Sequence, residues 1–116
     1  MFKALADETR IRMLNLLNTG ELCVCDIEEV LDIKQSNASR HLNRLKSAGI
    51  ILSAKKSQWV YYRINDAIKI KYPFIQTIIQ DELEKIEVCK DDMALLAKHQ
   101  ASGFTCEQRT VRNKKH

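Results

Sequence analysis

The sequence lacks the features that would remove it from the class of soluble globular domains. It has no run of 18 apolar residues, so no membrane-spanning helix is expected, and its N-terminus carries no signal-peptide pattern. It has no internal repeat, low-complexity tract or linker, and aromatic residues make up only 6% of its 116 residues. These absences favour one cytoplasmic domain with a core of Leu and Ile on helices, rather than a sheet sandwich.

Acidic residues are absent from one long window of the chain. None occurs between Asp32 and Asp66. The net charge of +4 is too small to indicate nucleic-acid binding by itself, but phosphate contacts need concentrated Lys and Arg. The window from Ile33 to Asn65 is therefore predicted to be an electrostatic footprint for DNA. It contains the basic residues Lys34, Arg40, Arg44, Lys46, Lys55, Lys56 and Arg63.

Three helices are predicted before residue 50. Asp7 can cap the first, whose apolar residues recur at helical spacing until Gly20. A short second helix covers residues 27–31, and a third runs from about residue 36 to 48, where Gly49 supplies the left-handed residue past its end. On the third helix the spacing points Leu42, Leu45 and Ala48 to the core and leaves Asn37, Arg40, His41 and Arg44 largely outward.

After Gly49 the apolar period changes from 3.6 to 2. Residues 50–53 and 59–64 are predicted strands, joined as a hairpin by residues 54–58. This order predicts a winged helix-turn-helix, mainly α with a small β-hairpin, whose third helix enters the major groove of duplex DNA. Asn and Gln can pair with adenine and Arg with guanine. The candidate DNA-binding residues are Gln35, Ser36, Asn37, Ser39, Arg40, His41 and Arg44 on the helix, with Lys55 and Lys56 at the hairpin tip.

The C-terminal part is predicted to contain a long helix that begins at Pro73. Phe74, Ile75, Ile78, Ile79, Leu83 and Ile86 mark one apolar face of it. Such a face packs on the core or on a second copy, and a homodimer is favoured because two copies read two half-sites. A last short helix is expected over residues 93–101, capped by Asp91 or Asp92. We expect one domain over residues 1–102, with terminal dimerisation helices, and a basic flexible tail over 103–116.

Four segments together resemble the ArsR/SmtB family of winged-helix metal-sensing repressors: ADETRIRMLNLL, ELCVCD, QSNASRHLNRLKSAGI and WVYYRI. The resemblance covers roughly residues 2–64. It implies a homodimer, with no enzymatic activity and no required cofactor, that represses its operon and leaves double-stranded operator DNA when a toxic ion binds. The segment ELCVCD is similar to the sensor site of arsenite-responsive repressors, and also to that of the family's cadmium and lead sensors. His41 lies in the reading helix of that family, where a phosphate contact, burial and simple exposure all remain open.

Cys23 and Cys25 are the candidate metal ligands, because soft thiolates select thiophilic ions such as arsenite, lead and cadmium. Residues two apart point the same way in an extended chain but lie about 200° apart around a helix. One ion is therefore held more easily by both cysteines when the chain is not helical there. Binding is expected to distort the start of the second helix and to tilt the reading helix away from its groove.

The third ligand is open, since many arsenite sensors of this type carry a third Cys where this chain has Glu28. Cys89 or Cys106 of either subunit, a small thiol or hydroxide are the alternatives. Cys89 and Cys106 could also be buried hydrophobes or form a separate pair for methylated arsenicals. As(III) ranks first as effector, with Sb(III) beside it. Cd(II) or Pb(II) is the alternative that the acidic neighbours of the pair favour, and a winged helix without any effector is another.

An enzyme is the rival class, because Cys106 to Arg112 formally matches the phosphate loop of thiol phosphatases. That loop needs glycines, a preceding strand and a following helix, and this segment has no glycine inside it. A dithiol redox centre is equally disfavoured, since no βαβ pattern surrounds the cysteine pair. The protein is therefore not expected to be an enzyme.

Overall fold

The structure, a computed structural model, describes residues 2–101, apart from the side chains of Phe2 and Glu84. Its first half contains α1 (Phe2–Leu5), α2 (Glu8–Leu17), β1 (Leu22–Cys23), α3 (Val24–Leu31), α4 (Gln35–Ser47), β2 (Ile51–Lys56) and β3 (Trp59–Ile64). Its second half contains α5 (Asp66–Lys71), α6 (Pro73–Thr77), the π-helical turn η1 (Ile78–Glu82), the 3₁₀ turn η2 (Leu83–Lys85) and α7 (Glu87–Ala101). The strands form one antiparallel sheet in the order β1-β3-β2. Two helices, α3 and α4, followed by this hairpin make the predicted winged helix-turn-helix.

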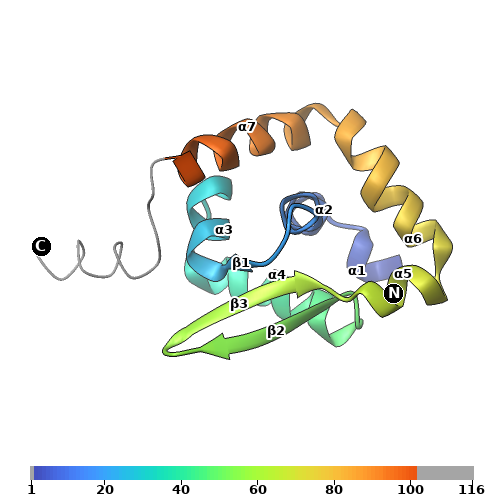
Figure 1. Cartoon of the computed structure of the whole chain (residues 1–116), viewed down its shortest axis with the longest axis horizontal. Coiled ribbons are helices and arrows are strands. Elements are labelled where there is room, and N and C mark those ends of the chain that lie inside the picture. Colours follow the sequence, from blue (N-terminus) through green and yellow to red (C-terminus); the bar gives the residue numbers. More distant parts are fainter. Residues whose placement is uncertain (1, 102–116) are drawn as a thin grey trace, which may run out of the picture.

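Helix α2 forms the centre of the molecule. Figure 1 shows it nearly end-on, with the other helices arranged around it and the β2–β3 hairpin projecting below. Met13, Leu14 and Leu16 are fully buried, and α2 contacts α1, α3, α4, α7 and β3. The predicted cap is confirmed, because Asp7 Oδ1 accepts a hydrogen bond of 3.2 Å from the backbone N–H of Arg10.

The α3–α4 pair is joined by a tight turn of residues 32–34. Asp32 ends α3 with a left-handed φ of 53°, a conformation that a short polar side chain tolerates. At the end of α4, Gly49 has the predicted left-handed conformation, with φ 78°. Helix α3 begins at Val24, earlier than the predicted residue 27, so the cysteine pair lies at its start.

The wing differs from the expected hairpin in length. Residues predicted as a loop from 54 onward continue β2, since Ala54 pairs with Tyr61 and Lys56 with Trp59. Only Ser57 and Gln58 connect the strands, and Ser57 has φ 61°. The sequence did not indicate β1, in which Leu22 pairs with Tyr62 and Cys23 with Tyr61, because two residues are too few to show a period.

The helix predicted from Pro73 begins there, but it is not one regular long α-helix. Helix α6 continues into π and 3₁₀ turns, and the chain becomes extended at Ile86, with φ −84° and ψ 126°. Ile75, Ile79 and Leu83 are at most 2% exposed, so most of the predicted apolar face packs into the core of the same chain. The long C-terminal helix is α7, which begins at Glu87 and not near residue 93.

Asp92 is a core residue and not the expected helix cap. It lies inside α7, is 1% exposed, and accepts two hydrogen bonds from Arg12, at 2.8 Å from Nε and 2.9 Å from Nη2. The hydrogen bond with Asp92 raises the pKa of Arg12. This bidentate pair fastens α7 to the central helix α2. Among residues 2–101 no helix has the length and apolarity that a bilayer crossing requires.

The Arg12–Asp92 pair generates a stability prediction. Replacement of Arg12 with Met should lower the free energy of unfolding by about 3 kcal/mol, because it leaves a buried carboxylate without its partner. The matched control is Lys90→Met, since Lys90 forms an exposed pair with Glu87 at 4.0 Å in the same helix. That change should alter stability by less than about 0.5 kcal/mol. Urea denaturation of both variants measures the difference, and equal losses would contradict this account.

Candidate DNA-binding surface and cysteine site

Helix α4 presents most of the predicted DNA-reading side chains to solvent. Its apolar stripe of Ala38, Leu42 and Leu45 is fully buried, which turns the opposite face outward. Of the predicted residues, Gln35, Ser36, Arg40 and Arg44 are exposed, and Asn37 and Ser39 are half-buried. The structure therefore places these residues on one accessible face of the second helix of the pair.

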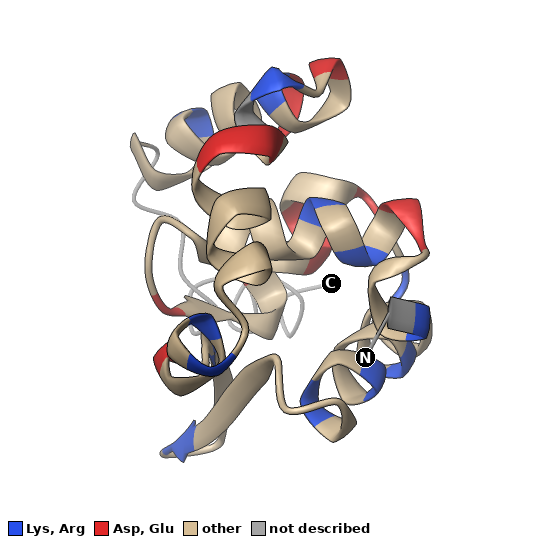
Figure 2. Ribbon diagram, turned by 90° about the vertical axis from the view of Figure 1, so that its right-hand side faces the viewer, with Lys and Arg blue, Asp and Glu red and all other residues tan. Residues whose placement is uncertain are grey.

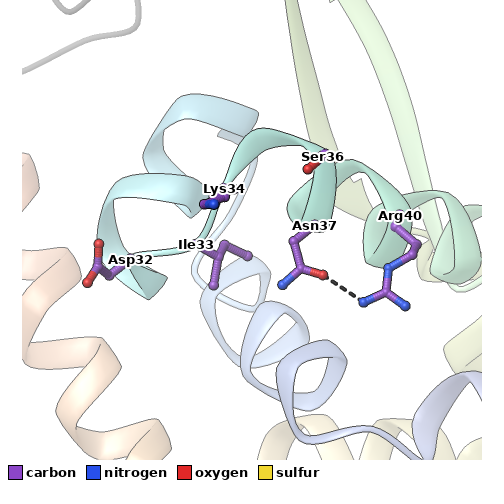
Figure 3. Close-up of a pocket in the computed structure, with 6 residues that line it drawn as sticks. All are labelled: Asp32, Ile33, Lys34, Ser36, Asn37 and Arg40. Carbon is purple, nitrogen blue, oxygen red and sulfur yellow. Dashed lines mark hydrogen bonds between the residues drawn. The ribbon is translucent and has the colours of Figure 1, made fainter.

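A hollow of about 610 Å³ lies at the start of α4. Figure 3 shows its lining residues, Asp32, Ile33, Lys34, Ser36, Asn37 and Arg40. Arg40 Nη2 donates a hydrogen bond of 2.7 Å to Asn37 Oδ1, so these two side chains orient each other. Lys34, the exposed residue before α4, was not among the predicted site residues. Its position in the acid-free window was the signal that could have identified it.

The expectation that His41 faces outward is wrong. His41 is 5% exposed and lies beneath α2, where Arg10 Nη1 is 3.1 Å from its Nδ1. Because a guanidinium only donates, Nδ1 must accept and the imidazole is neutral, with its proton on Nε2. Burial lowers the pKa of His41, the charges of Arg10 and Arg40 lower it further, and Asp7 at 3.8 Å opposes them. In this arrangement the His41 side chain is buried and contacts α2 through Arg10.

The wing supplies the second basic element. Lys55 and Lys56 are both exposed near the hairpin tip, as the sequence predicts. Lys56 Nζ forms an ion pair with Glu21 and lies 5.1 Å from the centre of the Tyr61 ring. Figure 2 shows basic segments prevailing along the lower edge of the molecule, whereas the largest acidic segments lie near its upper edge. The ion pair joins the wing to the segment just before the cysteine pair.

Cys23 and Cys25 lie on either side of the boundary between β1 and α3. Cys23 is the last residue of β1 and the residue before α3, with an extended backbone of φ −72° and ψ 148°, and is 2% exposed. Cys25 is half-buried in the first turn of α3. Asp26 accepts a hydrogen bond of 3.2 Å from the Cys23 N–H through Oδ2, and its Oδ1 meets His99 Nε2 at 2.8 Å. The pair is therefore placed where strand, helix and C-terminal helix meet.

Cys89, one of the two other predicted cysteines, is not brought to this position. Cys89 lies in α7, is fully buried, and burial raises the pKa of its thiol. Cys106, the predicted tail over 103–116 and the segment from Cys106 to Arg112 lie outside the described residues. Within residues 2–101 no three His, Cys, Asp or Glu side chains are arranged to hold a metal ion.

Comparison with known proteins identifies similar regulators. The sequence profile described as bacterial regulatory protein, arsR family, matches residues 7–53. The arsenic resistance transcriptional regulator ArsR1 of Pseudomonas putida is 48% identical over 69 residues, which are 59% of this chain and 54% of that protein. The cadmium resistance regulatory protein CadC homolog of Staphylococcus aureus is 42% identical over 67 residues, 57% of this chain and 55% of that protein. The chain thus spans little more than half the length of these curated relatives.

A solved structure of a similar protein has the same fold. The homodimeric winged helix-turn-helix DNA-binding domain of Mb0332 from Mycobacterium bovis, described as a possible ArsR-family regulator, has a TM-score of 0.58 to this structure. The two sequences are 30% identical, and the match covers 73% of this chain and 80% of that one. This similarity confirms the predicted winged helix-turn-helix fold.

The buried His41 generates a pH prediction. Since its pKa in the folded state lies below the unfolded value near 6.5, its contribution to stability is complete above that pH. The contribution is lost as the pH falls through the folded pKa, because the unfolded chain then binds the extra proton first. As the pH falls below about 6.5, the free energy of unfolding should therefore fall more steeply for the wild type than for His41→Gln. Parallel curves from urea denaturation at several pH values would contradict this.

Proposed function

The chain belongs to the arsR family of bacterial regulatory proteins, and on that premise we propose that it is a homodimeric repressor controlled by trivalent arsenic. In this proposal it binds operator DNA and releases it when arsenite binds reduced Cys23 and Cys25. The family and the similar proteins are transcriptional regulators and not enzymes. The observation that carries the proposal is the position of Cys23, which both ends β1 and precedes α3.

The proposed DNA contacts combine α4 with the wing. The exposed face of α4 enters the major groove. There Arg40 and Asn37, which are hydrogen-bonded to each other, also offer hydrogen-bonding groups to base edges. Lys34 and Arg44 lie at the margins of that face and contact phosphates. Lys55 contacts the DNA backbone from the wing. His41 has no part in this proposed interface, since its side chain is buried.

The proposed switch transmits strain from the cysteine pair in two directions. Cys23 pairs with Tyr61 of the wing strand β3, and α3 is joined to α4 by only three residues. One arsenic atom bound to both sulfurs pulls the extended Cys23 and the helical Cys25 toward a common point. The resulting distortion acts on the wing through β1 and on α4 through α3. A typical coupling of about 1–3 kcal/mol gives roughly 5- to 150-fold weaker DNA binding.

The surroundings of the pair favour arsenic over a divalent cation. Cadmium or lead would gain from carboxylates beside the thiolates, and Glu21 and Asp26 flank the pair in sequence. In the structure Glu21 pairs with Lys56, and both Asp26 oxygens accept hydrogen bonds. A cation would have to displace these partners, whereas trivalent arsenic needs only sulfur. The cadmium or lead regulator remains the second candidate, because the similar CadC homolog is named for cadmium resistance.

The proposed homodimer follows the similar Mb0332 domain, which is described as homodimeric. Large apolar side chains that remain on the surface suit such an interface. Ile70 is 82% exposed and Phe74 is 37% exposed, and they lie in the adjacent helices α5 and α6. The interface is therefore proposed to include this corner, and not the inner face of α6 and η1.

The DNA contacts are tested with a duplex that carries the promoter of the gene. Arg40→Ala should weaken binding about tenfold or more by loss of a base contact, and Lys55→Ala should reduce the salt slope by about one. Lys90→Ala, at an exposed position of α7, is the matched control and should leave both values unchanged. Fluorescence anisotropy over a range of salt concentrations measures them. Unchanged binding by both Arg40→Ala and Lys55→Ala would reject this interface.

The switch is tested by arsenite-dependent release of the same duplex, with a non-thiol reductant present. Arsenite should release the wild type, and Cys23→Ser and Cys25→Ser should each retain DNA at arsenite concentrations that empty the wild type. Without arsenite all three proteins should bind DNA equally, which controls for folding. Release that persists in both variants would reject the cysteine pair as the sensor. Release by cadmium or lead but not by arsenite would instead support the second candidate.

A further inference from the structure

The fold brings one carboxylate to the basic wing. The window from Ile33 to Asn65 contains no Asp or Glu. Glu21 precedes this window in the sequence, yet its side chain forms an ion pair with Lys56, the last residue of β2. Of the Lys and Arg residues in the window, only Lys56 is paired with a carboxylate within residues 2–101. The two lysines of the wing, Lys55 and Lys56, are therefore not equally available to DNA.

Two groups hold the ammonium of Lys56 in place. One is the Glu21 carboxylate, and the other is the ring of Tyr61, whose centre lies 5.1 Å from Lys56 Nζ. The face of an aromatic ring attracts a cation, so the two contacts reinforce each other. Successive residues of a strand point to opposite faces of the sheet, which directs Lys55 away from this cluster. Lys56 is thus fixed on one face of the hairpin by contacts that Lys55 does not share.

The ion pair is accessible to a second anion. The Lys56 side chain is 58% exposed and that of Glu21 is 30% exposed. A lysine ammonium binds carboxylate and phosphate oxygens alike, because it acts as a compact point charge. An exposed ion pair changes an equilibrium constant by a factor of only about 1.5 to 5. The pair with Glu21 is therefore weak enough for a phosphate to replace it, and strong enough for its loss to be measured.

We propose that Glu21 competes with DNA phosphate for Lys56 and thereby lowers the affinity of the wing for DNA. In the free protein the ammonium of Lys56 pairs with Glu21. On the duplex it contacts a phosphate, and the Glu21 carboxylate returns to water. The cost of opening the ion pair is subtracted from the gain of the phosphate contact. This inference rests on the proposed function, since it concerns the same DNA interface.

The competition takes place next to the proposed sensor. Glu21 lies two residues before Cys23, and Cys23 pairs with Tyr61, the residue whose ring faces Lys56. Figure 1 shows β1 beside β3 at this position. A DNA contact by Lys56 therefore frees a carboxylate in the segment that leads into the cysteine pair. Glu21 is in this sense a positioning residue for the wing and not a DNA contact itself.

The test is a double-mutant cycle, measured by fluorescence anisotropy with the promoter duplex and without arsenite. Glu21→Gln should bind DNA about two- to fivefold more tightly than the wild type, because no ion pair has to open. In the Lys56→Met background the same change should leave the affinity unchanged, since no ammonium remains to be released. An equal gain in both backgrounds would show that Glu21 acts only through its charge at long range, and would overturn the inference. So would unchanged or weaker binding by Glu21→Gln alone.

Two further variants control for charge. Glu82→Gln removes the carboxylate of another exposed pair, with Lys85 at 3.4 Å, and should leave DNA affinity unchanged. A gain as large as that of Glu21→Gln would contradict the competition. Lys56→Arg keeps the positive charge and should restore the response to Glu21→Gln, and a missing response would also contradict it. Urea denaturation of each variant checks that it is folded under the conditions of the binding assay.

The same measurements separate this inference from the proposed function. If the wild type does not bind the promoter duplex, the proposed function itself fails. If the wild type binds and responds to arsenite, but the cycle shows no coupling between Glu21 and Lys56, the proposed function stands and only the competition is rejected.

Discussion

The carboxylate of Asp26 joins three parts of the chain. Its Oδ2 accepts the N–H of Cys23, the last residue of β1, and its Oδ1 meets Nε2 of His99 in the last turn of α7. Asp26 itself belongs to the first turn of α3, where a negative charge is favoured by the exposed N–H groups. One side chain therefore links the strand, the helix and the C-terminal helix beside the cysteine pair.

The elements around this junction are short, and that shortness couples them. Strand β1 has two residues and the α3–α4 turn has three, so neither can absorb a displacement by bending along its length. Strand β1 and the α3–α4 turn lie beside α2, which is largely buried and is linked to α7 by the Arg12–Asp92 pair. A change at Cys23 or Cys25 would therefore act between the rigid helix α2 and the surface of α4 that we propose to bind DNA. Such an arrangement suits a protein whose input and output lie in one small domain.

Local signals in the sequence predicted much of this fold, and distant pairings were beyond them. Asp7 and Gly49 indicate helix ends because caps depend on a few neighbouring residues, and both were confirmed. The buried face of α7 was missed because it carries Asp92 and His99, whose partners Arg12 and Asp26 lie 80 and 73 residues away. His41 was misplaced for the same reason, since Arg10 of α2 provides the contact that permits its burial. The cysteine pair was singled out by its own spacing, and its role as the sensor stays a prediction.

The π-helical turn at Ile78–Glu82 constrains the number of residues between α6 and α7. The hydrogen bonds of a π turn span five residues, one more than those of an α turn, so the π turn accommodates one additional residue. Deletion of a single residue there would restore regular winding, but it would also rotate everything that follows on the helix by about 100°. Leu83 would leave the core, and the start of α7 would be displaced from α2. The additional residue of the π turn therefore allows Leu83 to face the core and α7 to pack on α2 at the same time.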